Sequence, residues 1–127
     1  MYSKTTNNIK VTVLPTYLDQ HSQPDENRYI WAYTIQLENH GEANVQLLNR
    51  YWHITDGVGR SQEVRGPGVI GEQPVLKPGD TFEYSSGSSI PTAVGTMRGS
   101  YQLVAEDGTR FEASIPEFTL SVPRVLH

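Results

Sequence analysis

The chain has 127 residues, with 10 Lys and Arg against 14 Asp and Glu, so its formal net charge is -4 at pH 7. A length within the usual domain range of ~100–150 residues predicts a single domain, residues 1–127. Cysteine is absent, which excludes disulfides, thiolate metal sites and cysteine nucleophiles. The acidic balance argues against a nucleic-acid or anionic-membrane partner, and no run approaches the ~20 apolar residues of a membrane span. We therefore expect a soluble protein of the cytoplasm.

Alternation of apolar and polar residues is the strongest pattern in the chain. Apolar side chains occupy every second position in residues 9–13, 28–38, 97–106 and 110–115. Because neighbouring side chains on a strand point to opposite faces, this pattern predicts strands with one buried face. Pro15 interrupts the first run, which favours an edge strand there.

Residues 45–56 alternate less cleanly. Leu47 and Leu48 are both apolar, and Trp52 and Ile54 share the parity of Leu48. We interpret this segment as a strand with one core face and one partly covered face.

Turn signals separate the expected strands. Asp107-Gly108 lies between two alternating runs and predicts a hairpin, since this pair tolerates positive φ. Residues 39–42 and 56–59 have the composition of turns, and shorter strands are expected at 62–64 and 82–84. About seven antiparallel strands with turns every ~8–12 residues predict an all-β sandwich of the immunoglobulin-like or fibronectin type III-like class.

Residues 66–71 read Gly-Pro-Gly-Val-Ile-Gly, which matches G-x-G-x-x-G. A dinucleotide site needs a helix after these glycines. Two prolines within residues 72–79 leave no room for that helix, and Pro67 lacks an N–H. We predict an ordered loop between strands with glycines at positive φ. A weaker anion site made by loop amides, with Arg65 or Arg60 nearby, stays open.

Catalytic and metal motifs are missing from the sequence. The histidines, His21, His40, His53 and His127, lack the spacing of metal ligands, and no EF-hand pattern is present. The serines of residues 85–89 lack a nucleophile elbow. We predict no catalytic residue, no cofactor and no metal ligand, and hence a protein that is not an enzyme.

The aromatic side chains divide by their expected positions. Those predicted to lie in the core are Trp31, Tyr33, Tyr101 and Phe111. Those whose placement stays open are Tyr29, Tyr51, Trp52 and Tyr84. An exposed member of the second group is the kind of residue that anchors a protein partner.

Seven segments spread over nearly the whole chain form a distinctive set. They are RYIWAYT (28–34), VQLLNRYW (45–52), ITD (54–56), GPGVIGEQPVLKPGD (66–80), FEYSSG (82–87), GTMRGSYQL (95–103) and IPEFTL (115–120). In this order they resemble the bacterial ApaG family, also called CorD. The resemblance implies a fibronectin type III-like sandwich and no defined reaction. The family names refer to a gene neighbour that is a diadenosine tetraphosphatase and to a cobalt and magnesium sensitivity phenotype. Related domains in eukaryotic F-box and polymerase-delta-interacting proteins imply a protein-binding role.

We therefore expect a non-catalytic binding module with an unidentified protein partner. The residues predicted to form its contact surface are Arg50, Trp52, Arg65, Gly66, Gly68, Gly71, Glu72 and Gln73. Two alternatives stay open. One is weak binding of a small anion or nucleotide, such as pyrophosphate, by the loop 66–71. The other is binding of a divalent cation, suggested only by the CorD phenotype.

Overall fold

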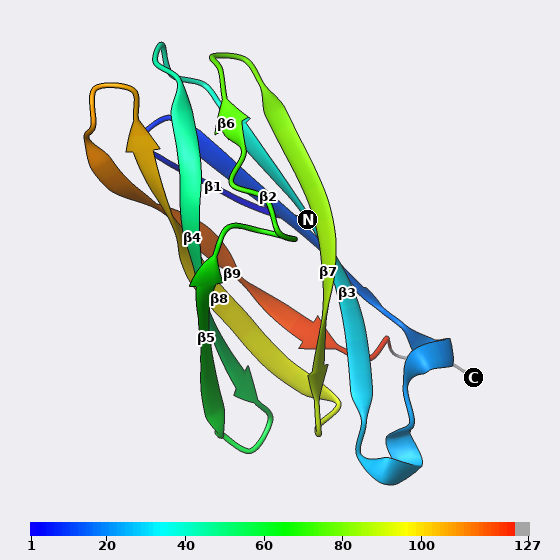
Figure 1. Cartoon of the computed structure of the whole chain (residues 1–127). Coiled ribbons are helices and arrows are strands. Elements are labelled where there is room, and N and C mark those ends of the chain that lie inside the picture. Colours follow the sequence, from blue (N-terminus) through cyan, green and yellow to red (C-terminus); the bar gives the residue numbers. More distant parts are fainter. Residues whose placement is uncertain (124–127) are drawn as a thin grey trace.

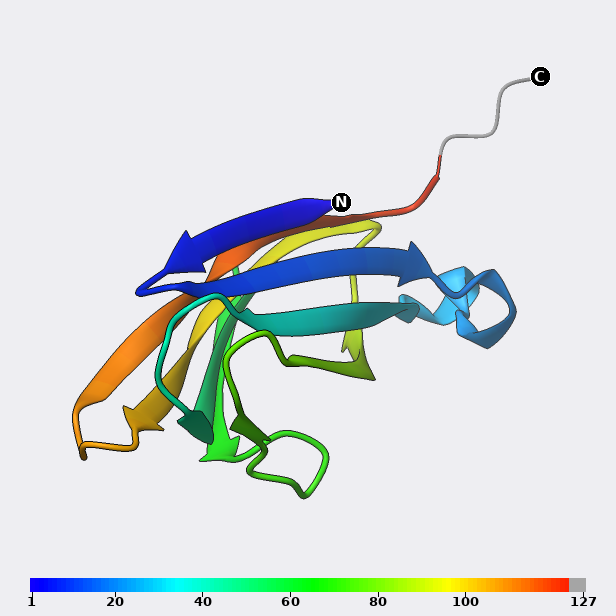
Figure 2. The same cartoon turned by 90° about the horizontal axis from the view of Figure 1, so that it is seen from above.

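The computed structural model describes residues 1–123 and shows two antiparallel β-sheets packed face to face (Figures 1 and 2). The first sheet has the order β1 (Tyr2–Thr6), β2 (Ile9–Tyr17), β3 (Tyr29–Asn39) and β7 (Thr81–Ile90). The second has the order β5 (Ser61–Pro67), β4 (Val45–Asp56), β8 (Val94–Ala105) and β9 (Arg110–Ser121), with β6 (Val75–Leu76) also paired to β4. Two short 3-10 helices, η1 (Asp19–His21) and η2 (Pro24–Glu26), join β2 to β3. The predicted sandwich is confirmed, with β1 and β6 as strands that the sequence pattern did not indicate.

The core lies between the two sheets, where the predicted alternation places it. In β3, the side chains of Trp31, Tyr33, Ile35 and Leu37 are buried, each 5% exposed or less. The same period-2 pattern buries Tyr101 on β8. None of the helices within residues 1–123 is long and apolar enough to cross a membrane.

The strand β2 corrects one expectation. Its first half pairs with β1 as well as with β3, so the prediction of an edge strand at residues 9–13 is wrong. The β1 pairing ends where Tyr2 faces Val13, and Pro15 lies beyond this point, paired only with Tyr33 of β3. Because one side of β2 has no strand neighbour there, the missing N–H of Pro15 breaks no ladder hydrogen bond.

A β-bulge in β4 explains the irregular pattern of residues 45–56. The register against β8 shifts between Leu47 and Asn49, which makes Leu48 the extra residue. An extra residue reverses which parity faces the core. Val45 and Leu47 therefore point inward before the bulge, whereas Arg50, Trp52 and Ile54 point inward after it, and of these only Arg50 is not buried.

The two edges of the sandwich differ. At one edge β9 packs against β1 and β2, and β1 and β9 run side by side in Figure 2. At the other edge lie β5 and β7, and within residues 1–123 each of these strands is paired on one side only. The second edge is therefore open, and the cavity described next lies there.

Candidate functional site

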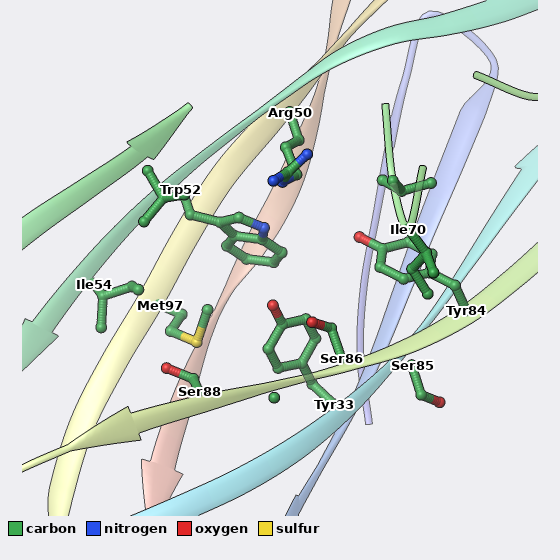
Figure 3. Close-up of a pocket in the computed structure, with 13 residues that line it drawn as sticks. Tyr33, Arg50, Trp52, Ile54, Ile70, Tyr84, Ser85, Ser86, Ser88 and Met97 are labelled. Atoms are coloured by element: carbon green, nitrogen blue, oxygen red, sulfur yellow. The ribbon is translucent and has the colours of Figure 1, made fainter. Parts of the chain in front are cut away.

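A cavity of about 470 Å³ opens between the sheets at the edge bounded by β5 and β7 (Figure 3). Its volume is within the range of ~300–1,000 Å³ that is typical of small-ligand sites. Trp52 and Met97 form part of its apolar floor and are both buried. Val64 and Ile70 lie at its rim and are 40% and 63% exposed. The cavity thus combines an apolar interior with an accessible mouth.

Arg50 points into this cavity because the bulge at Leu48 turns its side chain inward (Figure 3). Its Nη1 donates hydrogen bonds of 3.0 Å to the carbonyl oxygens of Pro67 and Gly68. Gly66 faces Arg50 across the β4–β5 ladder, and a Cβ at Gly66 would lie 3.0 Å from both Nη1 and Nη2. A residue without a side chain at position 66 therefore lets the guanidinium lie against β5.

The positive charge of Arg50 has no carboxylate partner among residues 1–123. The ion pairs in that part of the chain are His40–Glu38, Arg60–Asp56 and Arg65–Glu63. The two carbonyl groups that accept from Nη1 are dipoles and compensate the charge only in part. Nε and Nη2 donate to no acceptor in residues 1–123, and no buried side-chain nitrogen there lacks a partner. These N–H groups are therefore accessible to a ligand.

Three tyrosine hydroxyls lie near Arg50 and stay protonated at neutral pH. Tyr33 lies within hydrogen-bonding reach of Ser86, and the hydroxyls of Tyr84 and Tyr101 are hydrogen-bonded to each other. Burial raises the pKa of all three tyrosines above the ordinary value, although the Arg50 charge acts in the opposite direction. Tyr33 and Tyr84 therefore supply hydroxyl groups to the cavity, and none of the three phenols supplies a negative charge for Arg50.

Trp52 adds a further donor. The residue is 4% exposed, and its indole N–H donates to no protein acceptor in the described chain. Figure 3 shows the indole nitrogen on the side of the ring nearest Arg50. Trp31, in contrast, donates its indole N–H to the carbonyl oxygen of Ser121 at 3.2 Å. The two tryptophans thus differ in whether their N–H is free for a ligand.

The loop after β5 is held by its own hydrogen bonds. The N–H of Gly68 donates to the Leu48 carbonyl at 2.8 Å, and Nε2 of Gln73 donates to the same oxygen at 2.9 Å. Val69 and Glu72 exchange backbone hydrogen bonds of 2.8 and 2.9 Å. The carbonyl that receives two of these bonds belongs to the bulged residue of β4, so the bulge also fixes the loop.

The glycines of this loop have the expected conformation in part. Gly68 and Gly71 have φ of +60 and +73, which confirms the prediction of positive φ for these two. Gly66 lies within β5 and is not among the residues with positive φ. No helix follows the loop, which turns back through Ile70, at φ 48, toward β6. The G-x-G-x-x-G pattern here builds a tight turn, as the prolines indicated.

The structure brings some of the predicted contact residues together and separates others. Arg50 and Trp52 share the cavity, and Gly66 packs on the Arg50 guanidinium. Arg65 instead lies over the Tyr51 ring, 4.6 Å from its centroid, and pairs with Glu63 at 2.9 Å. Because β-strand side chains alternate, Arg65 faces outward from β5 and away from the cavity.

Sequence reasoning missed three polar residues of the cavity. The alternation predicts Tyr33 in the core, leaves the position of Tyr84 open and gives Ser86 no role beyond the serine-rich residues 85–89. All three line the cavity beside Arg50. A run of small polar residues on an edge strand was the one signal that pointed toward an accessible site.

Metal-ligand geometry is absent from the described chain. Residues 1–123 contain no group of three or more His, Cys, Asp or Glu side chains placed to hold an ion. His53 lies beside Arg98, whose Nε is 3.4 Å from Nδ1. His127 lies outside the described residues.

Comparison with known proteins identifies close relatives. A family model described as the ApaG domain matches residues 19–105. Protein ApaG of Dechloromonas aromatica is 57% identical over 119 residues, which cover 94% of each chain. Protein ApaG of Nitrosospira multiformis is 61% identical over 119 residues, with the same coverage of 94%. The crystal structure of the putative ApaA protein of Bordetella pertussis superposes with a TM-score of 0.90 at 50% identity, over 92% of this chain and 95% of that one.

Proposed function

The chain belongs to the ApaG family, and we propose that it is a non-catalytic binding module that holds a protein partner at the open edge of the sandwich. The observation that carries this proposal is the cavity between β5 and β7. It has an apolar floor, an exposed apolar rim and a cation that has no carboxylate partner among residues 1–123. Aromatic and arginine side chains in a concave site are the usual anchors of a protein interface.

The free edge of β7 supports a protein partner in particular. An unpaired strand edge presents backbone N–H and C=O groups to an extended segment of another chain. β7 is paired to β3 alone, and outside that ladder its backbone forms no hydrogen bond with residues 1–123. Residues 85–89 of this strand are Ser or Gly, whose small side chains leave the edge open to approach.

Site-specific photocrosslinking in the native cell tests the proposal. A photoreactive amino acid is placed at Val64 or Ile70, at the rim of the cavity, and for comparison at Leu14, which is 49% exposed and lies on β2. We expect the same protein adduct from both rim positions and no such adduct from Leu14. Equal yields from all three positions, or no adduct from the rim in folded protein at native expression levels, would contradict the proposal.

The two alternatives have less support from the geometry. Binding of pyrophosphate by the loop 66–71 requires free amides, yet Pro67 has no N–H and the N–H groups of Gly68 and Val69 already donate within the protein. Binding of a divalent cation has no cluster of ligands in residues 1–123 to support it. Both alternatives, like the links to cobalt sensitivity and to diadenosine polyphosphates, stay predictions.

A further inference from the structure

We propose that the cavity binds the C-terminal residue of a partner protein, with its carboxylate held by Arg50 and Trp52 and its apolar side chain on the floor formed by Trp52 and Met97. This inference rests on the proposed function, because it assigns a chemical group to the partner at the same edge. It differs from the loop-amide site that the sequence suggested, since the donors here are side chains of β4.

The N–H donors of Arg50 and Trp52 that face the cavity have no protein acceptor among residues 1–123. Arg50 has accessible N–H groups at Nε and Nη2, and the indole N–H of Trp52 is free of protein partners in residues 1–123. The hydroxyls of Tyr33 and Ser86 lie on the opposite wall, and Figure 3 shows them directed into the same space. A planar guanidinium matches the two oxygens of a carboxylate, and such charge-assisted hydrogen bonds are stronger than neutral ones. An oxyanion completes this set.

The charge of the site favours a monoanion over a phosphate group. Among residues 1–123, Arg50 is the one cation that lines the cavity. Arg60 lies just before β5 and is paired with Asp56, and Arg65 lies within β5 and is paired with Glu63. A phosphate monoester carries a charge of about −1.5 to −2 at neutral pH and is bound in proteins by clusters of arginine. A carboxylate matches the single positive charge.

The position of the apolar floor favours a C-terminal residue over an acidic side chain. The donors and the buried surfaces of Trp52 and Met97 line one cavity of about 470 Å³, so anion and apolar group must lie close together in the ligand. A C-terminal residue carries its carboxylate and its side chain on the same carbon atom. The preceding residues then extend along the free edge of β7, where backbone pairing adds affinity.

Nuclear magnetic resonance titration of the full chain tests this inference with defined probes. The probes are N-acetyl-leucine, its neutral amide, a capped tripeptide that ends in leucine with a free carboxyl group, and inorganic phosphate. The chain has 2 tryptophans, so the Trp52 indole resonance reports the cavity. The Trp31 indole, bonded to Ser121, is the internal reference.

We expect N-acetyl-leucine to shift the Trp52 resonance and to bind at least about tenfold more tightly than its amide, because the charge-assisted hydrogen bonds are lost with the carboxylate. The tripeptide is expected to bind more tightly than N-acetyl-leucine, which distinguishes a protein C-terminus from a small metabolite. Equal binding of acid and amide, stronger binding of phosphate, or no gain from the tripeptide would overturn the inference.

A pair of neighbouring variants on β7 gives a matched control. Ser86→Asp adds a carboxylate in the cavity, and we expect it to pair with Arg50 and so compete with a ligand carboxylate. Ser85→Asp adds the same charge one residue away. Ser85 is also among the residues that line the cavity, but its hydroxyl bonds to Thr34 on the outer face at 2.9 Å and points away from the cavity in Figure 3. We expect Ser86→Asp to weaken N-acetyl-leucine binding at least about tenfold and Ser85→Asp to leave it unchanged. Equal effects of the two variants would overturn the inference.

The outcomes separate this inference from the proposed function. If Val64 and Ile70 crosslink a partner and Ser86→Asp does not reduce the yield, the open edge binds protein without a carboxylate, and only the inference fails. If N-acetyl-leucine binds at Arg50 while no partner crosslinks at the rim, the carboxylate site stands, and the assignment to a protein fails.

Discussion

The loop after β5 offers a direct comparison between two glycines of similar conformation in different surroundings. Gly68 and Gly71 have φ of +60 and +73, a region that costs an L-residue about 1–2 kcal/mol. A Cβ at Gly71 would have no heavy atom within 4 Å, whereas a Cβ at Gly68 would overlap the backbone carbonyl of Glu72. Gly71→Ala therefore carries the conformational cost alone, and Gly68→Ala carries a steric conflict as well.

The magnitude of the difference follows from the hydrogen bonds that must move. The Glu72 carbonyl accepts from the N–H of Val69 at 2.8 Å, and a net contribution of about 1 kcal/mol is lost when it shifts. We expect Gly71→Ala to lower the free energy of unfolding by about 1–2 kcal/mol and Gly68→Ala by about 3 kcal/mol. At about 4 °C per kcal/mol for a domain of this size, the Tm falls by roughly 4–8 °C and roughly 12 °C.

Urea unfolding at neutral pH measures both variants against the parent chain, provided that the m-value is unchanged. Equal destabilisation by the two alanines would refute the reasoning, because it would mean that the Glu72 carbonyl does not constrain Gly68. A larger effect at Gly71 would show that the turn has a different geometry from the one described.

Three further results are expected. Tyr84→Phe leaves the fully buried hydroxyl of Tyr101 without its partner and lowers the free energy of unfolding by about 1–3 kcal/mol. Adding Tyr101→Phe to the same chain removes the unpaired hydroxyl and restores part of this loss, which urea unfolding of the single and double variants checks. Burial raises the pKa of Tyr33, Tyr84 and Tyr101. The free energy of unfolding is therefore expected to be unaffected by these groups below the ordinary tyrosine pKa of about 10 and to fall above it, because the unfolded chain then loses protons that the folded chain keeps. An ultraviolet absorbance titration in which all 7 tyrosines of the folded chain ionise together would contradict this. Gly66→Ala displaces the Arg50 guanidinium, which lies 3.0 Å from the added Cβ, and weakens N-acetyl-leucine binding in the titration, whereas unchanged affinity would contradict the packing described.

The sandwich was predictable because its signal is local. One buried and one exposed face produce strict alternation, as in β3, and the Asp107-Gly108 turn is confirmed between β8 and β9, with Gly108 at φ +89. The short strands β1 and β6 lack this signal: β1 is mostly exposed and β6 has 2 residues, so pairing with neighbours defines them.

The cavity was only partly predictable because it depends on a bulge and on contacts between distant segments. Two adjacent leucines fit either a bulge or a strand covered on both faces, and only the pairing with β8 shows that Leu48 is the extra residue. That one residue decides that Arg50 points inward. Tyr33 and Ser86 reach Arg50 through the packing of two sheets, which no spacing along the chain encodes.

A crystal structure of the protein with the capped tripeptide that ends in leucine measures the central claim most directly. We predict that a carboxylate oxygen lies at hydrogen-bonding distance, about 2.7–3.2 Å, from Nη2 or Nε of Arg50, with the leucine side chain on Trp52 and the peptide along β7. A peptide bound on the outer face of either sheet, or in the cavity with its carboxylate directed away from Arg50, would contradict the account.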